Sequence, residues 1–97
     1  MLIDHQKISN TPIAGTFSGN TAHVRGLVKQ IVVKPLTETT TYNVSIINPL
    51  GAKIYERLSE TGTLSELTDM PCNGIYTVTI SSATVNELFV IQIITQE

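Results

Sequence analysis

Apolar and polar side chains alternate along several short stretches of the chain, and the alternation has the period of a β-strand. In residues 40–48, Tyr42, Val44 and Ile46 fall on one face, and mostly polar residues fall on the other. Residues 74–82 repeat this pattern. Each stretch predicts a strand with one buried and one solvated face. No segment keeps the helical period for more than about two turns, so we expect almost no helix.

A hairpin is predicted where the first of these strands ends. Residues 48–51 read Asn-Pro-Leu-Gly, which is the residue order of a type I turn. The returning strand then covers residues 52–59. We expect Ile54 and Leu58 on its inward face and Tyr55 on its outward face.

Two other stretches, residues 24–34 and 87–95, are apolar at almost every inward and outward position. Such runs predict strands that are covered on both faces, either because they are central in a sheet or because another chain covers them. Weaker strands are expected near residues 13–17 and 63–67. About six or seven short strands at this spacing predict an all-β fold, a single antiparallel β-sandwich or jelly-roll-like domain.

The first twelve residues differ from the rest, because they mix isolated apolar residues with polar ones and end at Thr11-Pro12. We interpret residues 1–12 as an extended N-terminal arm and residues 13–97 as the β-sandwich domain.

Composition narrows the class of protein. The chain has 97 residues, of which 41% are hydrophobic and 14% charged, enough apolar material for one core. A net charge of −2 argues against a nucleic-acid partner, and no apolar run reaches the roughly 18 residues of a membrane span. The single cysteine, Cys72, excludes an internal disulfide, and the N-terminal sequence lacks the pattern of a signal peptide.

The search for catalytic or metal-binding chemistry finds no motif. Only His5 and His23 could act as imidazole bases, and the serine in Gly-Thr-Phe-Ser-Gly at residues 15–19 is one position too late for a nucleophile elbow. The carboxylates do not follow the spacing of a calcium loop. We therefore expect a protein that is not an enzyme and that holds no cofactor or metal.

What remains is surface for contacting other proteins, because 97 residues can barely cover the doubly apolar C-terminal strand. We expect contacts with a partner through the arm and the residue that follows it, and self-association of the chain through the C-terminal strand. The candidate contact residues are Leu2, Ile3, Ile8 and Ile13 for the first surface and Phe89, Ile91 and Ile93 for the second.

Four segments taken in order carry a resemblance to a known family: GLVKQIVVKP at 26–35, TYNVSI at 41–46, GAKIY at 51–55 and NGIYTVTISSA at 73–83. Their succession resembles small β-sandwich virion proteins of tailed bacteriophages, especially the head decoration or cement type. The resemblance covers roughly residues 24–95. It implies a non-enzymatic protein present in many copies, which binds between subunits of the major capsid protein, or to other virion subunits, and stabilises the shell. It also implies assembly in the host cytoplasm and a final location on the capsid surface.

Two other functions remain open from the sequence. A carbohydrate-binding or adhesin-like module would use Tyr55 as its exposed ring, although the chain has no tryptophan. A neck or tail connector of the virion would share the same architecture.

Overall fold

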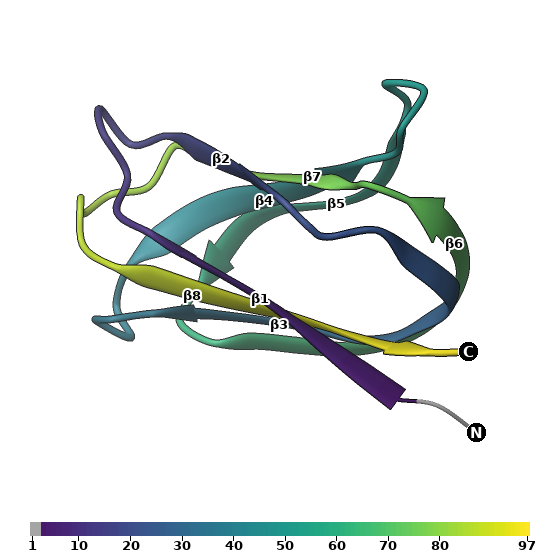
Figure 1. The fold of residues 1–97 in the computed structure, drawn as a ribbon. Coiled ribbons are helices and arrows are strands. Elements are labelled where there is room, and N and C mark those ends of the chain that lie inside the picture. Colours follow the sequence, from purple (N-terminus) through teal and green to yellow (C-terminus); the bar gives the residue numbers. More distant parts are fainter. Residues whose placement is uncertain (1–2) are drawn as a thin grey trace.

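The computed structural model describes residues 3–97 of the chain. In this part, eight antiparallel strands are joined by turns and loops, and there is no helix (Figure 1). The strands are β1 (Ile3–Asn10), β2 (Phe17–Asn20), β3 (Val24–Pro35), β4 (Thr41–Ile47), β5 (Lys53–Thr61), β6 (Leu64–Gly74), β7 (Thr77–Ser81) and β8 (Phe89–Gln96). They form two four-stranded sheets, in the orders β1-β8-β3-β6 and β2-β7-β4-β5. The prediction of an all-β sandwich is confirmed.

The order of the strands defines the topology of the sandwich. β1 pairs with β8, β2 with β7, β3 with β6 and β4 with β5, as in one long hairpin folded over on itself. The pairings β3·β8 and β4·β7 then join these pairs into the two sheets. Eight strands in this double-sheet arrangement form a jelly roll.

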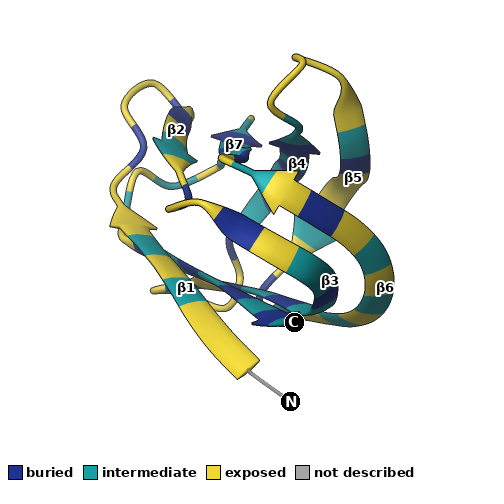
Figure 2. Cartoon of the chain, turned by 45° about the vertical axis from the view of Figure 1, so that its right-hand side comes forward, coloured by how far each residue is buried: buried dark blue, intermediate teal, exposed yellow. Residues whose placement is uncertain are grey.

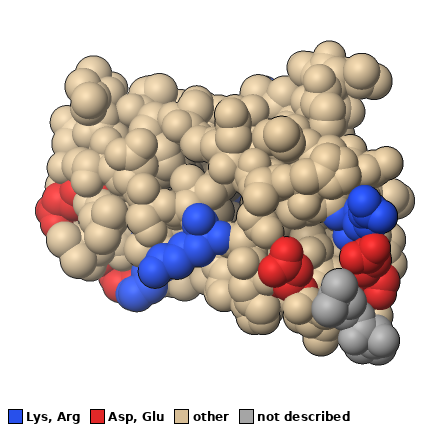
Figure 3. Space-filling view, viewed as in Figure 1, with Lys and Arg blue, Asp and Glu red and all other residues tan. Residues whose placement is uncertain are grey.

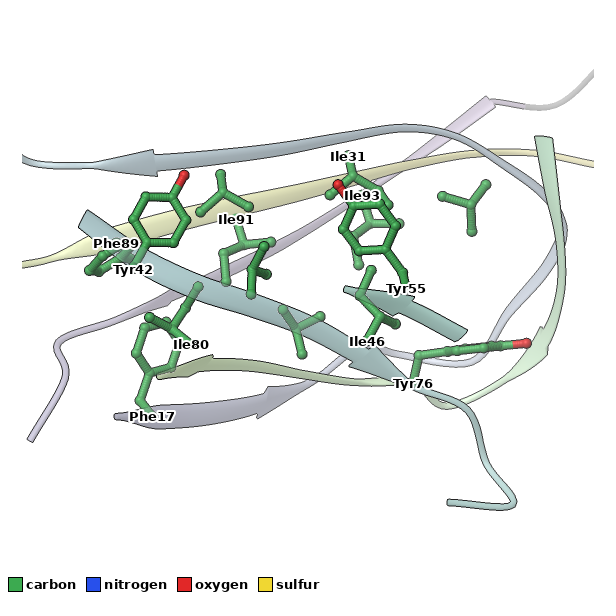
Figure 4. Packing of buried hydrophobic residues seen from close by; sticks show 14 of the residues in the cluster. Phe17, Ile31, Tyr42, Ile46, Tyr55, Tyr76, Ile80, Phe89, Ile91 and Ile93 are labelled. Atoms are coloured by element: carbon green, nitrogen blue, oxygen red, sulfur yellow. The ribbon is translucent and has the colours of Figure 1, made fainter. Parts of the chain in front are cut away.

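The core lies between the two sheets and contains the inward residues of the alternating strands (Figure 4). The ring of Phe89 meets that of Tyr42 edge-on, with centroids 5.1 Å apart and planes at 81°, and lies 6.0 Å from the ring of Phe17. These three rings come from β8, β4 and β2, so they join both sheets. Val44 and Ile46 are buried in the same core, as the alternation along residues 40–48 predicts.

The structure corrects the prediction of an N-terminal arm. Residues 3–10 form β1, an edge strand that pairs with β8 over eight consecutive positions without a bulge. Figure 2 shows that most of β1 is exposed, and only its Gln6 and Ile8 are half-buried. Because polar Asp4 and Gln6 occupy the inward positions beside Ile8, the segment lacks the alternation by which a strand is recognised.

The predicted hairpin is present, but the face of its second strand is reversed. Gly51 N–H donates to the carbonyl of Asn48 at 2.9 Å, which closes the expected turn. However, Tyr55 is 7% exposed and points into the core, whereas Leu58 is 60% exposed. The register with β4 shifts at two places, and it sets Tyr55 opposite the buried Ile46. Since cross-strand partners share a face, this register turns Tyr55 inward.

A candidate docking surface on one sheet

The outer face of the β1-β8-β3-β6 sheet is the candidate functional surface, and we call it the first outer face. Strand register places its residues in rows that run across the four strands. Each row is given in the strand order β1, β8, β3, β6. The first row is Ile3, Gln96, Leu27 and Pro71, and the second is His5, Ile94, Gln30 and Leu67. The third row is Lys7, Gln92, Val32 and Ser65, and the last is Ser9, Val90 and Lys34, without a residue of β6.

This face explains why β3 and β8 are apolar at both inward and outward positions. They are the two central strands of their sheet, so their inward residues lie in the core. Their outward residues, Val32, Val90 and Ile94 among them, are half-buried on a face that no other element of the described chain covers. Leu67 and Ile3 extend the apolar surface to the two edges, where they are 79% and 55% exposed.

The first outer face carries few charged side chains, and a basic side chain on it has no ion-pair partner within residues 3–97. Among the Lys and Arg residues of 3–97, only Lys7 is not in an ion pair. Lys29 pairs with Asp69 at the β3 bulge, and Lys34 pairs with Glu38 at 3.3 Å. Figure 3, in the view of Figure 1, shows few charged groups on a mostly uncharged surface, and some of its basic and acidic groups lie next to one another.

Uncharged polar side chains on the same face are held by hydrogen bonds to one another. The amide of Gln92 lies 2.9 Å from Nδ1 of His5, and the amide of Gln30 donates to the hydroxyl of Ser65 at 2.9 Å. These contacts fix side chains between neighbouring strands. A partner that docks on this face would therefore meet ordered groups, which lowers the entropic cost of binding.

The residues that the sequence predicts as partner contacts are not gathered in one place. Leu2 lies outside the described residues, and Ile3 lies on the first outer face. Ile8 points inward and packs against the core. Ile13 is 83% exposed in the connection between β1 and β2, where its backbone bridges to Thr16.

The prediction that Phe89, Ile91 and Ile93 mediate self-association is corrected by their burial. All three point into the core, so none can touch a second copy while the sandwich is folded. Their neighbours Val90 and Ile94 face outward instead. Both belong to the doubly apolar stretch at residues 87–95, and the alternation within that stretch could have identified them once the inward phase was known.

An open hollow of about 480 Å³ lies where β1 begins, β3 begins and β8 ends. Its lining residues are Ile3, Asp4, His23, Val24, Arg25, Thr95 and Glu97. Arg25 and Glu97 lie 3.8 Å apart, so the charges of this hollow are partly paired.

Within residues 3–97, no three His, Cys, Asp or Glu side chains gather as metal ligands would. Elsewhere, burial raises the pKa of the Cys72 thiol, which keeps it protonated at neutral pH.

No family model matches the chain, and no curated protein matches it. Solved structures share its fold. The mitogen of Yersinia pseudotuberculosis aligns with a TM-score of 0.59 and 6% identity over 99% of this chain and 87% of its own. A chain of the cyanophage Pam1 capsid asymmetric unit aligns with a TM-score of 0.57 and 10% identity over 96% and 80%. The lectin binding domain of Lectinolysin, solved with Lewis b, aligns with a TM-score of 0.50 and 8% identity over 95% and 92%.

At these identities the similarity shows a common fold. The chain is a jelly-roll β-sandwich whose fold also occurs in a phage capsid chain and in a lectin domain. In the described residues no helix is long and apolar enough to cross a bilayer.

Proposed function

We propose that this chain is a non-enzymatic structural protein of a tailed-phage virion, a decoration or cement protein that binds between capsid subunits through its first outer face. The observation that carries the proposal is a set of uncovered aliphatic side chains on this face, Val32, Val90 and Ile94 on the central strands and Ile3 and Leu67 on the edge strands, with glutamines between them. The resemblance of its sequence segments and the fold shared with a Pam1 capsid chain support the same role.

The geometry of this face suits attachment to a large, regular shell. Burial of apolar surface contributes about 25 cal/mol per Å² removed from water, so a sheet face with a few half-exposed aliphatic side chains supports a modest affinity for each site. Repeated sites on a symmetric shell add to that affinity where copies on neighbouring sites also contact one another. A protein that binds only the assembled shell stabilises the shell by mass action.

Co-sedimentation with phage heads assembled without this chain tests the proposal. The variant Ile94→Lys places a charge at the centre of the first outer face and should weaken binding at least about tenfold. The matched control is Ile47→Lys, because Ile47 is also a half-buried outward isoleucine, but on the outer face of the other sheet. Heads that do not bind the wild-type chain, or that lose binding only with Ile47→Lys, would contradict the proposal.

Self-association of the chain is a second part of the proposal, and the structure changes where it could occur. Phe89, Ile91 and Ile93 are buried. Copies that meet through the first outer face would have to separate before that face binds a shell, so self-association in solution and shell binding would compete. Light scattering over a concentration series measures this directly. We expect oligomers that Ile94→Lys dissociates, and a strict monomer at high concentration would remove this part of the proposal.

A further inference from the structure

The outer face of the β2-β7-β4-β5 sheet has a different chemistry from the first outer face, and we call it the hydroxyl face. Val44, Ile46, Val78 and Ile80 point into the core, so the residues between them point outward. Across the strands, the rows are Asn20, Thr77, Ile47 and Lys53; then Ser18, Thr79, Ser45 and Glu56; then Ser81 beside Asn43, followed by Thr41 beside Thr61.

This face is an array of hydroxyl and amide groups with little else. Its two charged residues, Lys53 and Glu56, both lie on the edge strand β5 and pair with each other at 2.5 Å. Ile47 is the one apolar side chain in these rows, and no aromatic ring belongs to them. Leu58 lies beside the rows, at the register shift of β5 opposite Asn43, and is 60% exposed. The interior of the face therefore offers hydrogen bonds without net charge.

Contacts between the side chains hold the array in place. The hydroxyls of Ser18 and Thr79 lie 3.0 Å apart, and the Thr77 hydroxyl donates to the Asn20 side chain at 2.8 Å. At the opposite end, the hydroxyls of Thr41 and Thr61 lie 3.1 Å apart. Because a hydroxyl has one donor and two acceptor positions, each group in these pairs keeps capacity for a ligand.

We propose that the hydroxyl face binds an uncharged polysaccharide chain. Such a ligand carries hydroxyl groups along its length, and these can donate to and accept from the array. An apolar protein surface would leave the buried hydroxyls unpaired, which is unfavourable. A nucleic acid would need cations, and Lys53 is already paired with Glu56.

The dimensions and the expected strength of binding follow from the sheet. Neighbouring strands lie about 4.8 Å apart, so four strands span about 14 Å, enough for a short run of sugar units. Since no ring is available for stacking, each site binds weakly, and strong attachment requires many copies of the chain on one particle or bead. Tyr55, the ring that the sequence suggested for a glycan platform, takes no part because it is buried.

The test is retention of the purified chain, immobilised in many copies on beads, on three neutral polysaccharides: cellulose, chitin and soluble starch. Anionic alginate serves as the ionic comparator. The double variant Thr79→Val with Ser45→Ala removes two adjacent hydroxyls from the centre of the face. It should lower retention on the polysaccharide that binds by about tenfold, because it removes two hydrogen bonds. The variant Thr79→Ser keeps the hydroxyl and should retain most of the binding.

The control variant Ser65→Ala with Ser9→Ala removes two hydroxyls from the first outer face and should leave retention unchanged. Thermal unfolding of each variant checks that the fold is intact. The proposal is overturned if none of the three neutral polysaccharides retains the chain, or if the hydroxyl-face variant and the control are retained equally. It is also overturned if the chain is retained better on alginate than on the neutral polysaccharides. Binding to phage heads is measured separately, so this result and that of the proposed capsid role do not depend on each other.

Discussion

Two neighbouring isoleucines of β8 have opposite environments, and substituting each with alanine tests the assignment of the two faces. Ile93 is 3% exposed and packs in the core. Ile94 is half-buried on the first outer face. The two substitutions remove the same atoms from consecutive positions of one strand, so the lower strand propensity of alanine affects both about equally.

The expected magnitudes differ because only one substitution leaves a cavity. Ile93→Ala should lower the free energy of unfolding by about 2–5 kcal/mol, as other substitutions of buried aliphatic residues do. Ile94→Ala leaves a space that water can enter, and it should cost below about 1 kcal/mol. A difference of about 2 kcal/mol corresponds to a gap of roughly 8–16 °C in melting temperature for a domain of this size.

Urea unfolding followed by far-UV circular dichroism measures both free energies in the isolated chain. If the two faces are assigned correctly, Ile93→Ala loses clearly more free energy of unfolding than Ile94→Ala. The slope of the free energy against urea concentration should be the same in both variants. Equal losses would mean that another part of the chain covers the first outer face, and a larger loss for Ile94→Ala would reverse the two faces.

Three further predictions follow from the described contacts. The buried hydroxyl of Thr40 has no hydrogen-bond partner within residues 3–97, so Thr40→Val should raise the free energy of unfolding by about 1 kcal/mol; a loss in urea unfolding would refute this. Deleting residues 1–10 removes β1 and leaves β8 unpaired along one edge, so the melting temperature should fall sharply; an unchanged value would support a dispensable arm. Burial, and then the hydrogen bond to Glu66, raise the pKa of Tyr55 to about 12. Folding therefore favours the neutral phenol, and this stability is complete below pH 10 and lost as the pH rises toward 12. In Tyr55→Phe, the free energy of unfolding measured in urea should fall less between pH 9 and 12 than in the wild type. An equal fall in both proteins would contradict this prediction.

Strands with a regular alternation could be recognised from the sequence alone. The pattern around Tyr42, Val44 and Ile46 is local, and it identified both the strand and its buried face. The doubly apolar stretches left open whether β3 and β8 are central strands or are covered by another chain, and the structure places both in the middle of their sheet with one face uncovered.

Other features depend on partners that are distant in sequence, and the sequence pattern does not contain them. The face of β5 is fixed by two register shifts against β4, so counting alternate positions put Tyr55 outside. β1 is an edge strand with polar inward residues, and its Gln6 side chain accepts a hydrogen bond from the backbone of Ala22 instead of packing in the core. Such a strand has no apolar alternation, so its sequence does not distinguish it from an extended arm.

The sequence predicts an apolar contact surface, but it does not predict which residues form that surface. Surplus apolar side chains in residues 87–95 indicate an interface, but the pattern does not show that Val90 and Ile94, rather than Phe89, Ile91 and Ile93, are the outward residues. Leu67 gave no signal as a contact residue, because Leu64, Leu67 and Met70 of β6 do not follow the two-residue period of a strand. Only the register of β6 against β3 places it beside Gln30 on the same face.

A cryo-electron microscopy map of phage heads with this chain bound tests the central claim most directly, because it shows which face of the sandwich meets the shell. The account predicts that Ile94 and Leu67 lie against capsid subunits and that the hydroxyl face points away from them. A chain that contacts the shell through the β2-β7-β4-β5 sheet, or that occurs only in the neck or tail, would contradict it.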